Sequence, residues 1–127
     1  MPLVRIELPE SIDARTGLRI GELINQAMID VIGVPNGDKF QIISRHPLEG
    51  RNLTAEYLGI RYSDKLVLIQ ITLNQGRTVE QKKAFYSRVA GDLAELGLRK
   101  QDVFINLVEV AKENWSFGNG EMQYGPQ

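Results

Sequence analysis

The sequence predicts an α/β (α+β) fold built from a β-α-β unit that occurs twice along the chain. Two observations predict it: blocks of residues recur at a fixed spacing, and each half follows the pattern strand, helix, strand. A crossover helix between two strands of one sheet implies a parallel pair with a right-handed connection. We therefore expect a four-stranded, mainly parallel sheet with two helices on one face.

The internal repeat has a spacing of 64 residues, which places residue 67 under residue 3. At this spacing Gly33 aligns with Gly97, and Asp38 aligns with Asp102. An Arg-Thr pair also recurs, at a spacing of 62 that a two-residue gap explains. Blocks that keep their order along the chain indicate a duplication. The aligned segments are 3–8 with 67–72, 33–43 with 97–107, and Arg15-Thr16 with Arg77-Thr78.

The first half begins with a short strand over residues 3–8, rich in Val, Ile and Leu. Thr16 is a suitable N-cap for a helix that runs to Ile32, where Gly33 and the following Pro35 end it. A second strand is expected over residues 40–44. Apolar residues near helical spacing predict the buried face of the helix: Leu18, Leu23, Ile24, Ala27, Met28, Val31 and Ile32.

The second half repeats this order with clearer signals. A strand over 67–72 is followed by Thr78 and Gln81, which fit a capping box. The helix is expected to run to about Leu96 and to stop at Gly97. The last long strand is expected over Val103 to Val110. The predicted buried face of this helix consists of Phe85, Val89, Leu93 and Leu96.

The length of 127 residues fits one domain, with halves at about 2–48 and 64–113. The segment 45–65 between them is polar, and a short strand is expected around Glu56 to Tyr62. The tail from Asn114 is rich in glycine and aromatic residues, which is typical of a hairpin or flap.

One face of the sheet has no predicted cover. Apolar residues occur at both alternating positions of the first strand, Val4 and Ile6 but also Leu3 and Leu8, and no third long helix is predicted. Self-association would bury such a face, so we expect an oligomer.

Composition excludes several classes of function. Fifteen basic and sixteen acidic residues give a net charge of -1, which argues against a nucleic-acid partner. The absence of cysteine excludes disulfides and thiolate metal sites, and a single histidine argues against a histidine-based metal site. No apolar run approaches the roughly 20 residues of a membrane span. We expect a cytoplasmic protein that needs no metal or other cofactor and has no membrane partner.

Pro2 has two interpretations. The first residue of a strand tolerates proline, so Pro2 can simply start the strand. Alternatively, removal of Met1, expected when the next side chain is small, would leave the secondary amine of Pro2 as the chain terminus. Such an amine, held in an apolar pocket, acts as a base when neutral and as an acid when cationic.

Two charged residues are candidate partners of this amine. Arg77 immediately precedes the Thr78 cap, where helix N–H groups and a guanidinium together favour a carboxylate. The alternative is a solvated loop arginine, and Arg15 has the same placement in the first half. Asp38 either orients a water or tunes the amine, or it only satisfies N–H groups of its turn.

Other side chains are weaker candidates. Trp115 and Phe117 in the tail can line a pocket, although aromatic residues in a short tail more often serve packing or an interface. His46 follows a strand and is a candidate acid or base, although a single histidine is more often structural.

Taken together, the motifs resemble the tautomerase superfamily, in which an amino-terminal proline works on a doubled β-α-β chain, the tautomerase/MIF-like fold. Within it the chain is most similar to the malonate semialdehyde decarboxylase family, over nearly its whole length. The run Gly-Arg-Thr-x-Glu-Gln-Lys at 76–82 also resembles the smaller 4-oxalocrotonate tautomerases. The stretches that carry the resemblance are Pro2-Leu3, Gly33-Val34-Pro35 with Asp38, Glu80-Gln81-Lys82, Phe85-Tyr86, and Trp115-Ser116-Phe117-Gly118 with Gly120.

The resemblance implies a homotrimer in which Pro2 is the catalytic amine, Asp38 its partner, and Arg77 the residue that holds a substrate carboxylate. The implied substrate is a small oxo acid, with Gln75, Trp115 and Phe117 as further contacts. The decarboxylase family has two arginines around a proline before the second helix, whereas residues 74–77 here read Asn-Gln-Gly-Arg. The candidates for the second arginine are Arg15, Arg19 and Arg45.

Three functions remain open at this point. A decarboxylase would use a cationic amine to stabilise the enolate left by loss of CO₂, or an iminium as electron sink, and hydratase chemistry belongs to the same class. A keto-enol tautomerase, an isomerase, would use a neutral amine to move a proton between carbon and oxygen. A trimer that binds small acids without catalysis is the third.

Overall fold

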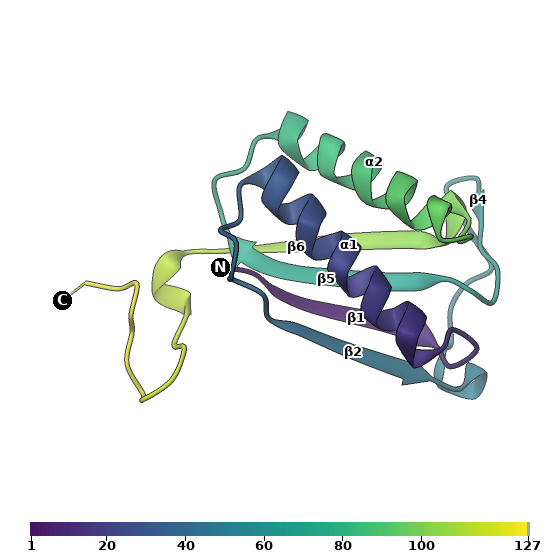
Figure 1. The fold of residues 1–127 in the computed structure, drawn as a ribbon, viewed down its shortest axis with the longest axis horizontal. Coiled ribbons are helices and arrows are strands. Elements are labelled where there is room, and N and C mark those ends of the chain that lie inside the picture. Colours follow the sequence, from purple (N-terminus) through teal and green to yellow (C-terminus); the bar gives the residue numbers. More distant parts are fainter. Residues whose placement is uncertain (127) are drawn as a thin grey trace.

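The structure, a computed structural model, describes residues 1–126 as a sheet covered on one face by two helices (Figure 1). The four strands of the sheet lie in the order β2-β1-β5-β6. The two predicted β-α-β halves are present, and their elements are β1 (Leu3–Pro9), α1 (Ala14–Ile32), β2 (Gln41–His46), β5 (Val67–Asn74), α2 (Val79–Glu95) and β6 (Val103–Val110).

The sheet is mixed, and its only antiparallel pair joins the two halves. β1 and β2 are parallel, as are β5 and β6, which confirms the prediction for each crossover unit. β1 and β5 run antiparallel, with Ile6 opposite Ile69. Each helix follows the carboxyl end of its first strand, so α1 and α2 begin at opposite ends of the sheet.

The core lies between the helices and the sheet. In β1, Val4, Ile6 and Leu8 are all fully buried against the helices. From the sequence, Leu8 was expected on the open face, and this prediction was wrong. Leu8 points to the same face as Val4 and Ile6, because side chains two residues apart in a strand share a face. Each such side chain contributes about 1.5–3 kcal/mol by leaving water. The helices supply Ile20, Ile24, Ala27, Met28, Ile32, Phe85, Val89 and Leu93.

Helix α1 begins earlier than predicted. Asp13, not Thr16, is the N-cap, and its carboxylate accepts the Thr16 N–H at 2.7 Å. At the start of α1 the buried face differs from the predicted one. Leu18 is 63% exposed, and Ile20 is fully buried in its place. Leu23 and Val31 pack at the edge of the core.

The ends of both helices confirm the repeat. Gly33 and Gly97 follow α1 and α2 with φ of 70° and 95°, left-handed conformations that glycine adopts without strain. Thr78 and Gln81 form the predicted capping box of α2. Leu96, however, is partly exposed because it is the C-cap itself.

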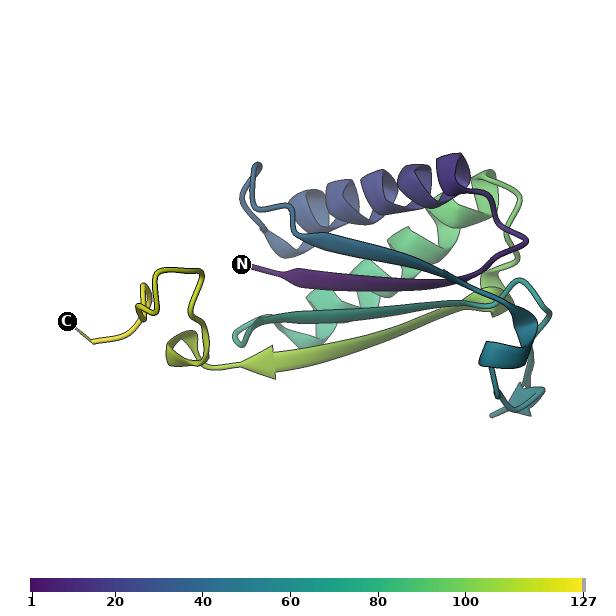
Figure 2. The ribbon, with the colours of Figure 1, turned by 90° about the horizontal axis from the view of Figure 1, so that it is seen from below.

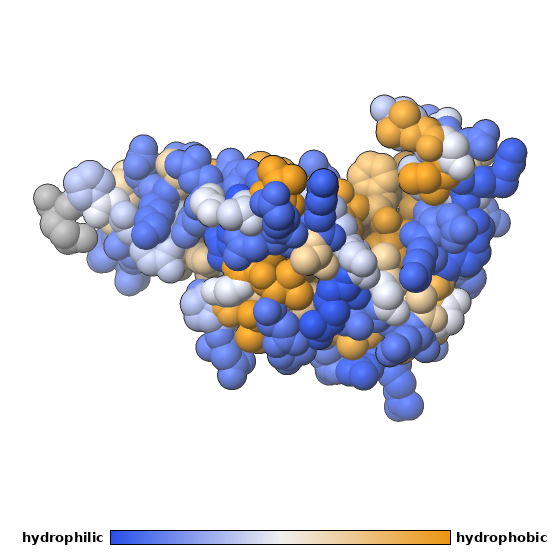
Figure 3. All heavy atoms as spheres, turned by 90° about the horizontal axis from the view of Figure 1, so that it is seen from above, coloured by the Kyte–Doolittle hydropathy of each residue, from blue (hydrophilic) through white to orange (hydrophobic). Residues whose placement is uncertain are grey.

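The connections differ from their predictions in detail. β2 starts at Gln41 rather than at residue 40. The segment 45–65 contains a short helical turn, η1 (Leu48–Gly50), and two strands, β3 (Glu56–Tyr57) and β4 (Ile60–Arg61), that pair as a hairpin instead of forming one strand. This hairpin projects from the end of the sheet far from the N-terminus (Figure 2). Apolar side chains lie on this projection (Figure 3), among them Leu58, which is 84% exposed.

The C-terminal tail starts with the helical turn η3 (Lys112–Asn114), and a matching turn, η2 (Lys100–Asp102), precedes β6. The tail forms a loop without strands, closed by Gln123. Its side chain accepts the Phe117 N–H at 2.9 Å and donates to the Gly118 carbonyl at 3.0 Å. Within residues 1–126, no helix is both long enough and apolar enough to cross a membrane.

Candidate active site

The chain terminus lies at the sheet end where β1 begins. Pro2 is buried, and the residues that follow it are fixed on both sides. The Val4 N–H donates to the Phe40 carbonyl at 2.9 Å, while Leu3 pairs with Thr72 of β5. The terminus is therefore held at the same end as the loop before β2 and the carboxyl end of β5.

The N-terminal amine, carried by Met1 in the full chain, is influenced by three charged side chains. Burial is the largest effect and lowers the pKa of this amine below its usual 8.0. The Asp38 carboxylate raises this pKa, whereas Arg77 and Lys112 lower it. The predicted residues Pro2, Asp38 and Arg77 thus come from three separate segments to one end of the sheet.

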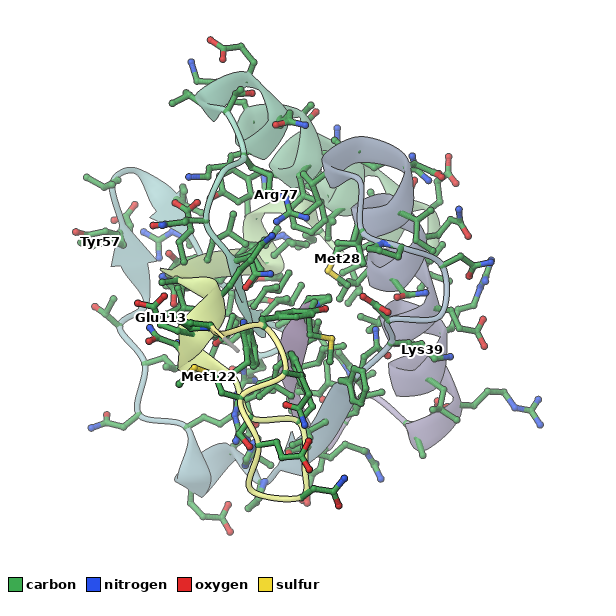
Figure 4. All side chains as sticks on the ribbon, turned by 90° about the vertical axis from the view of Figure 1, so that its left-hand side faces the viewer. Met28, Lys39, Tyr57, Arg77, Glu113 and Met122 are labelled. Atoms are coloured by element: carbon green, nitrogen blue, oxygen red, sulfur yellow. The ribbon has the colours of Figure 1, made fainter. Side chains whose placement is uncertain are left out.

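Arg77 is anchored by two backbone carbonyl groups. Its Nε donates to Ile32 O at 3.0 Å, and its Nη1 donates to Asn74 O at 2.9 Å. These bonds join the last turn of α1 to the end of β5. Seen end-on, Arg77 and Met28 lie towards the middle of this end of the molecule (Figure 4). Within residues 1–126, Arg77 forms no ion pair, so Nη2 can bind an external anion.

An ion pair between Lys82 and Glu109 supports the loop that carries Arg77. Lys82 Nζ donates to Glu109 Oε1 at 2.5 Å, and this contact is the largest of the effects that lower the Glu109 pKa. The Gly76 backbone N–H lowers the same pKa to a smaller extent. Since Gly76 directly precedes Arg77, Glu109 ties this loop to β6.

The predicted aromatic residues of the tail are joined to the end of β5 by a hydrogen bond. Trp115 Nε1 donates to Asn74 Oδ1 at 2.7 Å. Phe117 stacks on Trp115 with ring centroids 5.5 Å apart and 18° between planes, and Tyr124 meets the edge of Phe117 at 5.0 Å. Gln75 is exposed, and its backbone N–H donates to Val110 O at 2.9 Å.

The candidates for a second arginine lie elsewhere in this chain. Arg15 is in the first turn of α1, roughly 25 Å along the helix from the Ile32 carbonyl that Arg77 contacts. Arg19 pairs with Glu22 at 3.3 Å on the exposed side of α1. Arg45 donates to the carbonyl groups of two residues before α1, Ile12 at 2.8 Å and Glu10 at 2.6 Å.

His46 and Asp102 are also far from the terminus. His46 lies opposite Pro9 at the other end of β1, where its Nε2 contacts the Glu7 carboxylate. Asp102 is fully buried and accepts the Ser63 N–H at 2.8 Å and the Ser63 hydroxyl at 2.5 Å. Asp102 therefore has a structural role, whereas its repeat partner Asp38 remains half-exposed.

Sequence reasoning missed Lys112. It lies in η3, directly beyond the carboxyl end of β6, and parallel β5 and β6 end at the same edge. That rule of strand ends would have placed Lys112 at the same end of the sheet as Arg77. Within residues 1–126, no group of three or more acidic or histidine side chains is placed to hold a metal ion.

Comparison with known proteins assigns the chain to a family. The profile described as tautomerase enzyme matches residues 38–118. The probable tautomerase YusQ of Bacillus subtilis (strain 168) is 41% identical over 124 residues, 97% of this chain and 98% of the relative. The chain belongs to the tautomerase family.

Solved structures place this tautomerase near one branch of the superfamily. The FG41 malonate semialdehyde decarboxylase inhibited by 3-bromopropiolate is 33% identical, with a TM-score of 0.87 over 96% of this chain and 93% of that one. A second malonate semialdehyde decarboxylase, described with decarboxylase and hydratase activities, is 30% identical with a TM-score of 0.86 over 96% and 95%. A symmetric trimer of a fused 4-OT shares the fold at 21% identity, with a TM-score of 0.74 over 94% of each chain.

Proposed function

We propose that this tautomerase acts on a small oxo acid through the amine of Pro2, after removal of Met1. One observation carries the proposal: the N-terminal amine is partly desolvated beside a carboxylate, Asp38, and a guanidinium, Arg77. Desolvation and neighbouring charges bring an amine into the range in which it exchanges protons near neutral pH.

Each residue has a distinct task in this proposal. Arg77 binds the substrate carboxylate through its remaining N–H groups, with a geometry fixed by its bonds to Ile32 and Asn74. Asp38 opposes the charge of the protonated amine. Trp115 and Phe117 form an apolar wall, and the Gln75 amide offers a donor and an acceptor to the substrate.

The favoured reaction is chemistry like that of malonate semialdehyde decarboxylase, a C–C lyase or hydratase reaction. In the decarboxylation of a 3-oxo acid, the C–C bond breaks, CO₂ leaves, and the electron pair becomes an enolate. A cationic Pro2 stabilises this enolate and then donates its proton to carbon. The two similar decarboxylase structures, at 33% and 30% identity, support this choice.

A keto-enol tautomerase of 2-oxo acids is the second candidate, and the lowered pKa of the terminal amine favours it. Here the neutral amine removes a proton from the carbon next to the carbonyl and returns it to oxygen or carbon. The name of the Bacillus subtilis relative, a probable tautomerase, agrees with this reaction.

We also propose a homotrimer. The face of the sheet opposite the helices has no cover from residues 1–126 and carries exposed apolar side chains, among them Ile42, Phe104 and Val108. Burial of such a patch favours association. The fused 4-OT with the same fold is a symmetric trimer.

The test compares the processed protein with its Pro2→Ala variant. Mass spectrometry of the intact chain first establishes that each protein has lost Met1. We expect Pro2→Ala to lower the turnover of 3-oxo acids or of 2-oxo acids at least about 100-fold. Pro47→Ala, a proline substitution far from the terminus, serves as the control and should retain activity.

Two results would contradict the proposal. Equal turnover by both proteins would exclude the amine, and an absence of turnover by the native protein would favour a trimer that only binds small acids. Arg77→Ala then identifies the carboxylate site, because loss of the guanidinium should raise KM more than it lowers kcat.

A further inference from the structure

Lys112 is held at the same end of the sheet as Arg77. It begins η3, two residues after Val110, and Val110 lies opposite Asn74 in the parallel pair of β5 and β6. The hydrogen bond from Trp115 to Asn74 fixes the far side of this turn. Lys112 and Arg77 therefore extend from the ends of two adjacent strands.

The ammonium group of Lys112 has no partner within residues 1–126. At this end of the molecule Lys82 is paired with Glu109, whereas neither Lys112 nor Arg77 forms an ion pair. Both cations act on the same terminal amine. Two cations that form no ion pair and lie near one amine disfavour the charged form of that amine. A bound anion would offset this effect.

The balance of charged side chains at this end of the sheet favours a ligand with more than one anionic group. Asp38 supplies a single negative charge and opposes the terminal amine. Lys39 and Glu113 are exposed, carry opposite charges, and lie on either side of this end of the molecule (Figure 4), so together they add no net charge to it. Arg77 also acts on the Glu109 carboxylate, but that carboxylate is already paired with Lys82. One substrate carboxylate bound by Arg77 therefore leaves Lys112 unmatched.

We infer that Lys112 is a second substrate-binding cation, which makes the enzyme prefer small oxo acids that carry a second carboxylate. The inference rests on the proposed function, because it takes Arg77 as the partner of the first carboxylate. Lys112 is then a specificity-determining residue: it adds affinity for a diacid and none for the matching monoacid.

Two unreactive acids of equal chain length test this inference. Glutarate has a carboxylate at both ends, and valerate has a methyl group in place of the second one. Binding of each is measured by NMR titration with the processed protein, Lys112→Ala, Lys112→Arg and Lys100→Ala. Lys100 is the matched control, since it also begins a helical turn next to β6, at the opposite end of that strand.

We expect the processed protein to bind glutarate more tightly than valerate. Lys112→Ala should weaken the binding of glutarate about 10-fold and that of valerate less than about two-fold. Lys112→Arg should retain the preference for glutarate over valerate. Lys100→Ala should change the affinity for neither acid. Equal affinity of the processed protein for the two acids, binding of neither acid, or an equal loss of both in Lys112→Ala would overturn the inference.

The binding measurement is independent of the chemistry of Pro2. If Pro2→Ala and the processed protein turn over oxo acids equally while glutarate binding still depends on Lys112, the proposed reaction fails and this inference stands. Thermal unfolding of Lys112→Ala checks that the fold is intact, and no shift is expected because the side chain is exposed and unpaired.

Discussion

At the scale of single residues, the proposed chemistry depends on the terminal amine. Its desolvation lowers its pKa, Asp38 acts against this, and Arg77 and Lys112 add to it. In the full chain this amine belongs to Met1, and after its removal we expect the same three side chains to act on the nitrogen of Pro2. While Met1 is attached, that nitrogen is an amide and cannot take up a proton near neutral pH.

The pH dependence of activity distinguishes the two candidate reactions. A base must be neutral, so tautomerase activity should rise as pH increases through the pKa of the amine. A decarboxylase that needs the cation should instead lose activity over the same range. Burial lowers the pKa of the Met1 amine at this position, and we expect burial to shift the transition of the Pro2 amine in the same direction. Titration of ¹⁵N-labelled Pro2 by NMR gives the pKa, and a pKa well above neutral would contradict the neutral-base mechanism.

At the scale of elements, each helix has a glycine in a different environment. Gly91 lies within α2, and a Cβ added there would meet no atom within 4 Å. A Cβ on Gly17 of α1 would lie 3.0 Å from Leu8 Cδ1 and 3.4 Å from Ile43 Cγ2. Gly17 therefore lets α1 approach the sheet closely, whereas no contact within 4 Å constrains Gly91.

Gly91→Ala should stabilise the protein by about 0.5–1 kcal/mol, because alanine restricts the unfolded chain and favours the helix. Gly17→Ala is the matched variant and should gain nothing or lose stability. Urea unfolding measures both free energies. A larger stabilisation from Gly17→Ala than from Gly91→Ala would show that α1 is not tightly packed on β1 and β2.

Elements with strong local signals were predicted well from the sequence. The capping box at Thr78 and the strand Val103–Val110 were confirmed, because a local motif and an uninterrupted apolar run determine them. The cap at Asp13 was missed because two suitable capping residues lie three positions apart, and only packing selects between them. The β3–β4 hairpin was missed because it has only two residues per strand.

For the candidate site, the structure shows where the predicted residues lie and leaves their roles to experiment. Pro2, Asp38 and Arg77 lie shortly before β1, β2 and α2. The resemblance to the tautomerase superfamily, rather than the repeat alone, singled them out as one site. Lys112 carries no motif, and its place depends on where β6 ends relative to β5. The roles of all these residues remain predictions that the experiments above test.

At the scale of the whole molecule, the open face of the sheet determines the expected assembly. Phe104 is 41% exposed on this face, and Leu18 is 63% exposed on the helix layer. Phe104→Glu should dissociate the trimer, because it would place a carboxylate in an apolar interface. Leu18→Glu should leave the trimer intact. Analytical ultracentrifugation measures both, and a native protein that sediments as a monomer would contradict the assembly.

The antiparallel pairing of β1 with β5 places the equivalent ends of the two halves at opposite ends of the sheet. Equivalent elements lie at both ends of the sheet, but a polypeptide has a single amino terminus, and β5 follows a peptide bond where β1 follows a free amine. An assembly of such chains therefore holds one terminal amine per chain and not one per half. The proposed amine chemistry is therefore confined to one end of the sheet, and at the other end the equivalent aspartate, Asp102, is buried and accepts two hydrogen bonds from Ser63.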